Sequence, residues 1–104
     1  MKITIDTKNL YEDTLVGIAE SITEAETLSI LSKFDSFLIR CAVAENTKTS
    51  VETLARLAGD KDYGVRCAVA ENTNTPTEIL SKLAEDKNYN VRCAAAENPN
   101  TSVP

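Results

Sequence analysis

Apolar residues recur at helical spacing twice within each stretch of 26 residues. Between residues 65 and 72, and again between 79 and 84, they follow the i, i+3, i+4, i+7 spacing of one helix face. One unit is too short to bury both apolar stripes alone, so we expect two short helices per unit that pack against the two helices of the next unit. The positions are Val65, Ala68, Val69 and Asn72, then Ile79, Leu80, Leu83 and Ala84.

The pattern is an internal repeat with a period of 26 residues. Two leucines of the second stripe return at this period, as do four residue types in or beside the first stripe. Such a period predicts stacked units that share one continuous core. The positions are Leu28, Leu54 and Leu80; Leu31, Leu57 and Leu83; Arg40, Arg66 and Arg92; Cys41, Cys67 and Cys93; Glu45, Glu71 and Glu97; and Asn46, Asn72 and Asn98.

On this register residues 1–104 form a single repeat domain. We expect an N-terminal lid at 1–13, a degenerate capping repeat at 14–38, full repeats at 39–64 and 65–90, and a partial repeat at 91–104. Ile3 and Ile5 alternate with polar residues, which predicts an extended segment over the first repeat. The partial repeat stops after its first helix, so the stripe of Leu80, Leu83 and Ala84 should be covered by only half a layer.

The second helix of each unit has a start signal. "TPTE" from Thr75 offers a threonine N-cap, a proline at the first helical position and Glu78 to close a capping box. "TSVE" from Thr49 and "TEAE" from Thr23 preserve the threonine and the glutamate. Asp60 and Asp86, with Gly64 and Asn90, read as turn or capping residues before the next helix.

The stretch "VRCAVAENTNTPTEILSKLAEDKNYN" resembles the leucine-rich repeat variant family over residues 25–101, and less closely back to residue 14. The resemblance implies an all-α, right-handed α/α superhelical solenoid, in which an α-helix and a shorter 3₁₀-like helix alternate. Two departures from the family pattern loosen turns without changing the period. Threonine follows Asn46 and Asn72 where proline is usual, and lysine follows Asp60 and Asp86.

Composition narrows the function classes. A hydrophobic fraction of 42% with 26% charged residues is ordinary for a folded chain, and the net charge of -5 disfavours a general phosphate-backbone binder. The opening "MKITIDTKNLYED" has no apolar run typical of a signal peptide, and no stretch approaches a membrane span. We therefore expect a cytoplasmic protein with reduced cysteines, no membrane contact and no nucleic-acid partner.

The cysteine row is interpreted as packing. Stacked helices lie roughly 8–10 Å apart, whereas a disulfide needs Cα atoms within about 7 Å. With Val65 facing the core, Cys67 and Ala70 fall on the far side of the helix, which predicts a contact surface of small and aromatic residues. The surface comprises Cys41, Ala44, Tyr63, Cys67, Ala70, Tyr89 and Cys93. A metal or redox role for the cysteine row remains an alternative.

The arginine and glutamate rows predict ion pairs between layers. Arg66 and Glu71 lie on opposite flanks of one helix, so stacking would place the arginine of one repeat against the glutamate of the next. A nucleic-acid-binding arginine row is the alternative. The asparagine row is expected to tie down the loop backbone between the two helices, because buried loop amides need partners.

The chain is not expected to be an enzyme. It contains no histidine, which removes the commonest general base and metal ligand, and repetition gives its carboxylates the same environment in every unit, unlike an acid and base pair. We predict no catalytic residues, metal or cofactor, and a non-enzymatic protein-protein interaction module. Its partner is a protein, and its C-terminal end could pair with a second copy, continue into a longer array or stay open.

Overall fold

The computed structural model describes residues 7–101, with side chains described from residue 11. Within that range the chain forms seven α-helices and no strand. The helices are α1 (Thr7–Ser21), α2 (Ala25–Leu31), α3 (Phe37–Glu45), α4 (Val51–Leu57), α5 (Tyr63–Glu71), α6 (Thr77–Leu83) and α7 (Tyr89–Glu97).

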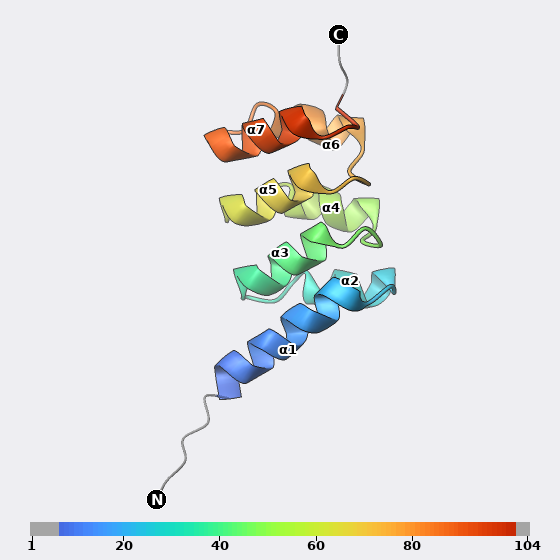
Figure 1. The fold of residues 1–104 in the computed structure, drawn as a ribbon, viewed down its shortest axis with the longest axis vertical. Helices are drawn as coiled ribbons and strands as arrows, with labels where there is room; N and C mark the ends of the chain where they lie inside the picture. Colours follow the sequence, from blue (N-terminus) through green and yellow to red (C-terminus); the bar gives the residue numbers. More distant parts are fainter. Residues whose placement is uncertain (1–6, 102–104) are drawn as a thin grey trace, which may run out of the picture.

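The helices stack in two rows (Figure 1). The longer helices α1, α3, α5 and α7 form one row, in which each member contacts the next, and the shorter α2, α4 and α6 lie behind them. Each short helix contacts the long helices before and after it in the chain. This confirms the all-α repeat prediction.

The core runs between the two rows. Leu28, Leu54 and Leu80 of the short helices are completely buried, as are Val43 and Val69 of the long helices. One contiguous cluster of buried side chains extends from α1 to α7. Each layer therefore completes the core of its neighbours, as the two apolar stripes predicted.

The short helices differ from the 3₁₀-like geometry that the family resemblance implied. Each of α2, α4 and α6 is a seven-residue α-helix. Tighter bonds between residues i and i−3 occur at the ends of these helices. Examples run from the Gly59 N–H to the Arg56 carbonyl after α4 and from the Ile79 N–H to the Pro76 carbonyl at the start of α6. Helix ends commonly tighten in this way, because the last carbonyls have no partner inside the helix.

The threonine N-cap prediction is wrong. Ser50 is the N-cap of α4, and its side chain accepts a hydrogen bond from the Thr53 N–H. Pro76 occupies the N-cap position of α6 without a side-chain cap. The preceding threonines, Thr49 and Thr75, instead donate to carbonyls in the last turn of the previous long helix, at 2.6 Å each. Each of these carbonyls also accepts the N–H of the asparagine that follows the helix. The buried threonine hydroxyl is therefore a second donor, and it ties the loop to the end of the helix.

The ends of the domain differ from the predicted division. The predicted boundary at residues 13 and 14 falls inside α1, which starts at Thr7. The extended segment predicted for Ile3 and Ile5 lies outside the described residues. Each later long helix begins two residues before the predicted boundary, because Ser36, Asp62 and Asn88 cap its N-terminus.

The half layer predicted over the leucine stripe at the C-terminal end is α7, and it does not leave the leucines exposed. Leu80 and Leu83 are 0% and 2% exposed, and only Ala84 lies at the surface. Helix α7 contacts α6, so a single long helix suffices to cover both leucines. The outermost element at this end is therefore α7.

Candidate interaction surface

The arginine row is paired with aspartates, and the predicted pairing with glutamates is wrong. Arg40 Nε donates to Asp60 Oδ2 at 2.8 Å and its Nη2 donates to Oδ1 at 3.2 Å. Arg66 makes the same two bonds to Asp86 at the same distances. These side chains are 8–11% exposed. Two parallel N–H···O bonds fix both the position and the plane of the guanidinium.

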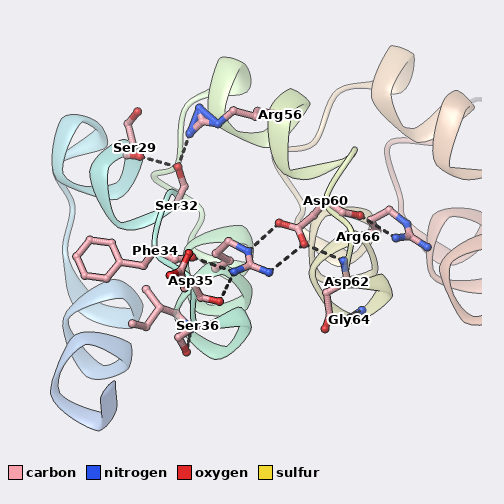
Figure 2. Close-up of polar contacts among 12 residues, drawn as sticks. Ser29, Ser32, Phe34, Asp35, Ser36, Arg56, Asp60, Asp62, Gly64 and Arg66 are labelled. Carbon is pink, nitrogen blue, oxygen red and sulfur yellow. Dashed lines mark hydrogen bonds and ion pairs between the residues drawn. The ribbon is translucent and has the colours of Figure 1, made fainter. Parts of the chain in front are cut away.

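Main-chain carbonyls extend each pair into a ladder. Arg66 Nη1 donates to the Asp60 carbonyl at 2.7 Å, and Arg92 Nη1 donates to the Asp86 carbonyl at 2.8 Å. Each aspartate thus receives one arginine on its side chain and the next arginine on its backbone. Figure 2 shows this arrangement around Asp60 and Arg66. The ladder thus links each layer to the next.

The pairing shifts the pKa of one member of each pair. The hydrogen bond that Arg40 donates to Asp60 raises the pKa of the Arg40 guanidinium. Burial alone would raise the pKa of Asp86, but the hydrogen bond from Arg66, the Asn88 N–H and the nearby positive charge together hold it below its usual value. Since Arg40 and Arg66 are buried and neutralised by carboxylates, neither presents a free cation to a phosphate backbone.

A signal for this pairing was present in the sequence. Asp60 and Asp86 repeat with the same period as the arginines, and each follows its arginine by 20 residues. That spacing crosses one loop, one short helix and one turn, which carries the aspartate to the level of the next layer. A helical wheel compares only residues of one helix, and it therefore predicted the glutamates as the partners of the arginines.

The asparagine row makes a second ladder. Asn72 Nδ2 donates to the carbonyls of Ala44 and Asn46, at 2.8 and 3.0 Å, and its Oδ1 accepts from the Asn74 N–H. Asn98 repeats these bonds one layer later. The side chain therefore orders its own loop and also joins it to the end of the preceding long helix.

The predicted contact surface is only partly at the surface. Tyr63 and Tyr89 are 51% and 69% exposed, and the three cysteines are free thiols of intermediate exposure. Ala44 and Ala70, however, are 0% exposed and belong to the core. They lie on the flank that the next long helix covers, and a methyl side chain is too short to reach past that contact. They cannot contact a partner in the folded chain.

The thiols of Cys41 and Cys67 are not activated. Burial, followed by the negative charges of Asp62, Glu45 and Asp60, raises the pKa of Cys41 to about 11. Burial and Glu71 also raise the pKa of Cys67. The thiolate is the form that attacks electrophiles and binds metals. Its formation is therefore opposed at both positions, which weighs against the redox and metal alternative.

The glutamate row forms an exposed line of like charges. Burial comes first among the causes that raise the pKa of Glu45, and the charges of Glu71 and Glu20 follow. These residues lie on neighbouring long helices, beside the cysteines. We call the exposed edge of the long-helix row the outer strip, and it consists of Cys41, Glu45, Cys67, Glu71, Cys93 and Glu97.

A groove adjoins the outer strip between α1 and α3. It has a volume of about 240 Å³, with Val16, Leu38 and Ala42 as its apolar lining and Asp13, Glu20 and Glu45 as its acidic lining; Cys41 completes it. None of these residues is basic. The groove can therefore receive an apolar side chain next to a positive charge.

The described part of the chain offers neither a metal cluster nor a membrane-spanning helix. Among residues 7–101 no three potential ligands from cysteine, aspartate and glutamate come together as a metal cluster would require. The described helices also include none with the length and apolar character needed to cross a bilayer.

Comparison with known proteins identifies the repeat. The family model described as leucine rich repeat variant matches residues 63–88, which cover α5, α6 and the following turn. No curated protein and no solved structure matches the chain. The matched segment contains Arg66, Asn72, Thr75 and Asp86, so it holds one complete set of the ladder residues.

Proposed function

Because the chain is built from repeats of the leucine rich repeat variant family, we propose that it is a non-enzymatic protein-protein interaction module whose contact site is the outer strip and the adjoining groove. The proposal is supported by a difference within each unit between the residues that bond neighbouring layers and those that remain exposed. Arginine, aspartate, asparagine and threonine make the bonds between layers, whereas the glutamate of every unit is exposed. The cysteines are partly exposed, although Cys41 and Cys67 also pack against the core. Surface residues that stability does not need are candidates for recognition.

The partner should present positive charge beside an apolar side chain. The groove lining is acidic and apolar, and Leu38 at its edge is 46% exposed. The negative charges of Glu20, Glu45 and Glu71 act on one another, so a lysine or arginine of the partner would relieve their repulsion. Complementary charge speeds association and selects among partners more than it increases affinity.

The proposed setting is the cytoplasm. The three cysteines are free, and free thiols are usual in reducing compartments. The burial of Arg40 and Arg66 against carboxylates gives no support to nucleic-acid binding, and the raised thiol pKa of Cys41 gives none to metal or redox chemistry.

Affinity capture with quantitative mass spectrometry tests the proposal. We expect the native chain to enrich a defined set of proteins, and Leu38→Glu combined with Glu45→Lys to lose it, because these changes add charge to the groove and reverse its rim. Val51→Glu is the control, since Val51 is 52% exposed on α4 in the other row. Equal capture by the native chain and the groove variant would place the contact site elsewhere.

A further inference from the structure

The outer face of α7 exposes groups that earlier layers bury. Ala44 of α3 and Ala70 of α5 are 0% exposed, while their counterpart Ala96 lies at the surface. Arg40 and Arg66 are 7% exposed, while Arg92 is half-buried. Within residues 7–101 its Nε and Nη2 meet no carboxylate, and its guanidinium lies 5.9 Å from the Tyr89 ring centre. This face is therefore one half of an interface between layers.

The opposite end of the stack presents the other half. Asn46 Nδ2 bonds the Ala19 carbonyl as Asn72 bonds that of Ala44, so Ala19 corresponds to Ala44 and Gly17 corresponds to Ala42. The residues at the Gly17 position in later layers, Ala42, Ala68 and Ala94, are 3%, 3% and 8% exposed. Gly17 is exposed, and a Cβ placed on it would have no atom within 4 Å.

The two ends are also complementary in charge. Residues 11–32, which span most of α1 and all of α2, contain five carboxylates and no lysine or arginine. The α7 face carries Arg92, whose two equivalents each bind an aspartate of the next layer. A carboxylate is thus the group that Arg92 lacks and that the α1 end supplies in excess.

We propose that the α7 face of one chain docks onto the α1 face of a second copy, so that Ala96 packs beside Gly17 and Arg92 meets the acidic end. The contact continues the stacking of α3 on α5 and α5 on α7. It uses two different faces, so an assembly of any size keeps one free face at each end and association is open-ended. A symmetric dimer of two α7 faces would instead bring two copies of Arg92 to the same interface.

Sedimentation velocity or light scattering of the full chain from about 10 µM to about 1 mM tests this. We expect the mass to rise with concentration for the native chain and to stay monomeric for Gly17→Arg and for Ala96→Arg, since each blocks one face. An equimolar mixture of the two variants should form a one-to-one pair, because each retains the face that the other has lost. Val51→Arg on α4 is the control and should associate like the native chain.

Helicity and the thermal midpoint of each variant check that it is folded. A native chain that stays monomeric up to about 1 mM overturns the proposal. So does a dimer that Ala96→Arg abolishes and Gly17→Arg leaves intact, since that result identifies a symmetric contact. Recovery of the one-to-one pair in the mixture is specific to docking of one face on the other.

Discussion

At the scale of single residues, the arginines illustrate how position in the stack decides what a side chain contributes. Arg66 and Arg92 occupy the same place in successive units, yet Arg66 has a carboxylate partner and Arg92 does not. A buried ion pair adds little net stability relative to apolar packing, but removing one partner leaves an uncompensated charge behind. The same substitution should therefore have different costs at the two positions.

Arg66→Ala is expected to reduce the free energy of unfolding by about 3–5 kcal/mol, because it leaves the Asp86 carboxylate buried without its cation. Arg92→Ala, which removes no ion pair, should cost less than about 1 kcal/mol. Urea unfolding of both variants and the native chain at one dilute concentration measures the difference. Similar costs at the two positions would mean that the pair to Asp86 is not what Arg66 contributes.

Asp86 also predicts a pH dependence. Its pKa in the folded chain lies below the usual value, which is about 3.9 in unfolded chains. The ionised carboxylate therefore contributes stability that is fully present above about pH 4, and that stability is lost as pH falls through the lower folded pKa. Unfolding free energy measured between pH 6 and pH 2.5 should fall less steeply in Asp86→Asn than in the native chain. Asp35→Asn, at an exposed position, is the control and should leave the slope unchanged.

At the scale of helices and loops, the asparagine after α3, α5 and α7 orders its loop, as the sequence predicted, and also bonds the preceding unit. Its side chain accepts one bond in its own loop and donates two to the preceding unit. The threonine three residues later bonds the long helix from the other side of the loop. Together they bond carbonyls near the C-terminal ends of α3 and α5 and tie the loop to both helices.

Asn72→Ala should cost about 1–3 kcal/mol, since it removes the donor to the Ala44 carbonyl, while the Asn46 carbonyl keeps its bond from the Thr49 N–H. Asn72→Asp should cost at least as much, because a carboxylate offers no donor and places negative charge against both carbonyls. The exposed Asn74 is the control, and Asn74→Ala should cost less than about 1 kcal/mol. Chemical denaturation of the three variants ranks them. A mild effect of Asn72→Asp would show that the two donated bonds contribute little.

Most of the helices and their buried faces could be predicted from the sequence, because the repeat supplies several independent copies of each signal. Leu54 and Val69 stand in apolar stripes whose spacing alone indicates helices and their buried faces. The failures concern polar side chains. Thr75 lies one residue too early to cap α6, and Arg66 reaches a carboxylate 20 residues away. Both outcomes depend on how neighbouring layers are placed, which local spacing does not encode.

The candidate site was less predictable for the same reason. Ala70 lies on the side of its helix opposite Val65, so a wheel of one isolated helix places it at the surface. The neighbouring helix of the next layer covers it completely. Cys67 and Tyr63, which lie farther round the helix, do remain accessible to solvent. The share of a long helix that is buried depends on the long helices on both sides of it and on the short helices behind it. The periodic pattern of one helix indicates only the face that packs on the short helices.

At the scale of the whole molecule, the continuous core implies that the layers unfold together. Leu57 is 2% exposed in the middle of the stack. Leu57→Ala should therefore cost about 2–5 kcal/mol from lost burial and the cavity that remains. Val51→Ala in the same helix, at an exposed position, should change stability by less than about 0.5 kcal/mol. Thermal or urea unfolding followed by circular dichroism measures both, and a negligible loss for Leu57→Ala would mean that this leucine is not central to the core.

Because both ladders repeat once per unit, the chain can be lengthened or shortened only by whole units. Removing or duplicating 26 residues anywhere between α3 and α7 returns each arginine to an aspartate and each asparagine to its two carbonyls. A change that is not a multiple of this length would alter the spacing of the partners that lie on either side of it. The first layer shows the effect of a small mismatch, since Asn46 bonds the carbonyls of Ala19 and Ile22, which are spaced differently from those of Ala44 and Asn46. Such a chain is suited to grow or shrink by recombination between its own units, with the number of layers as the variable and the bonding within each layer held constant.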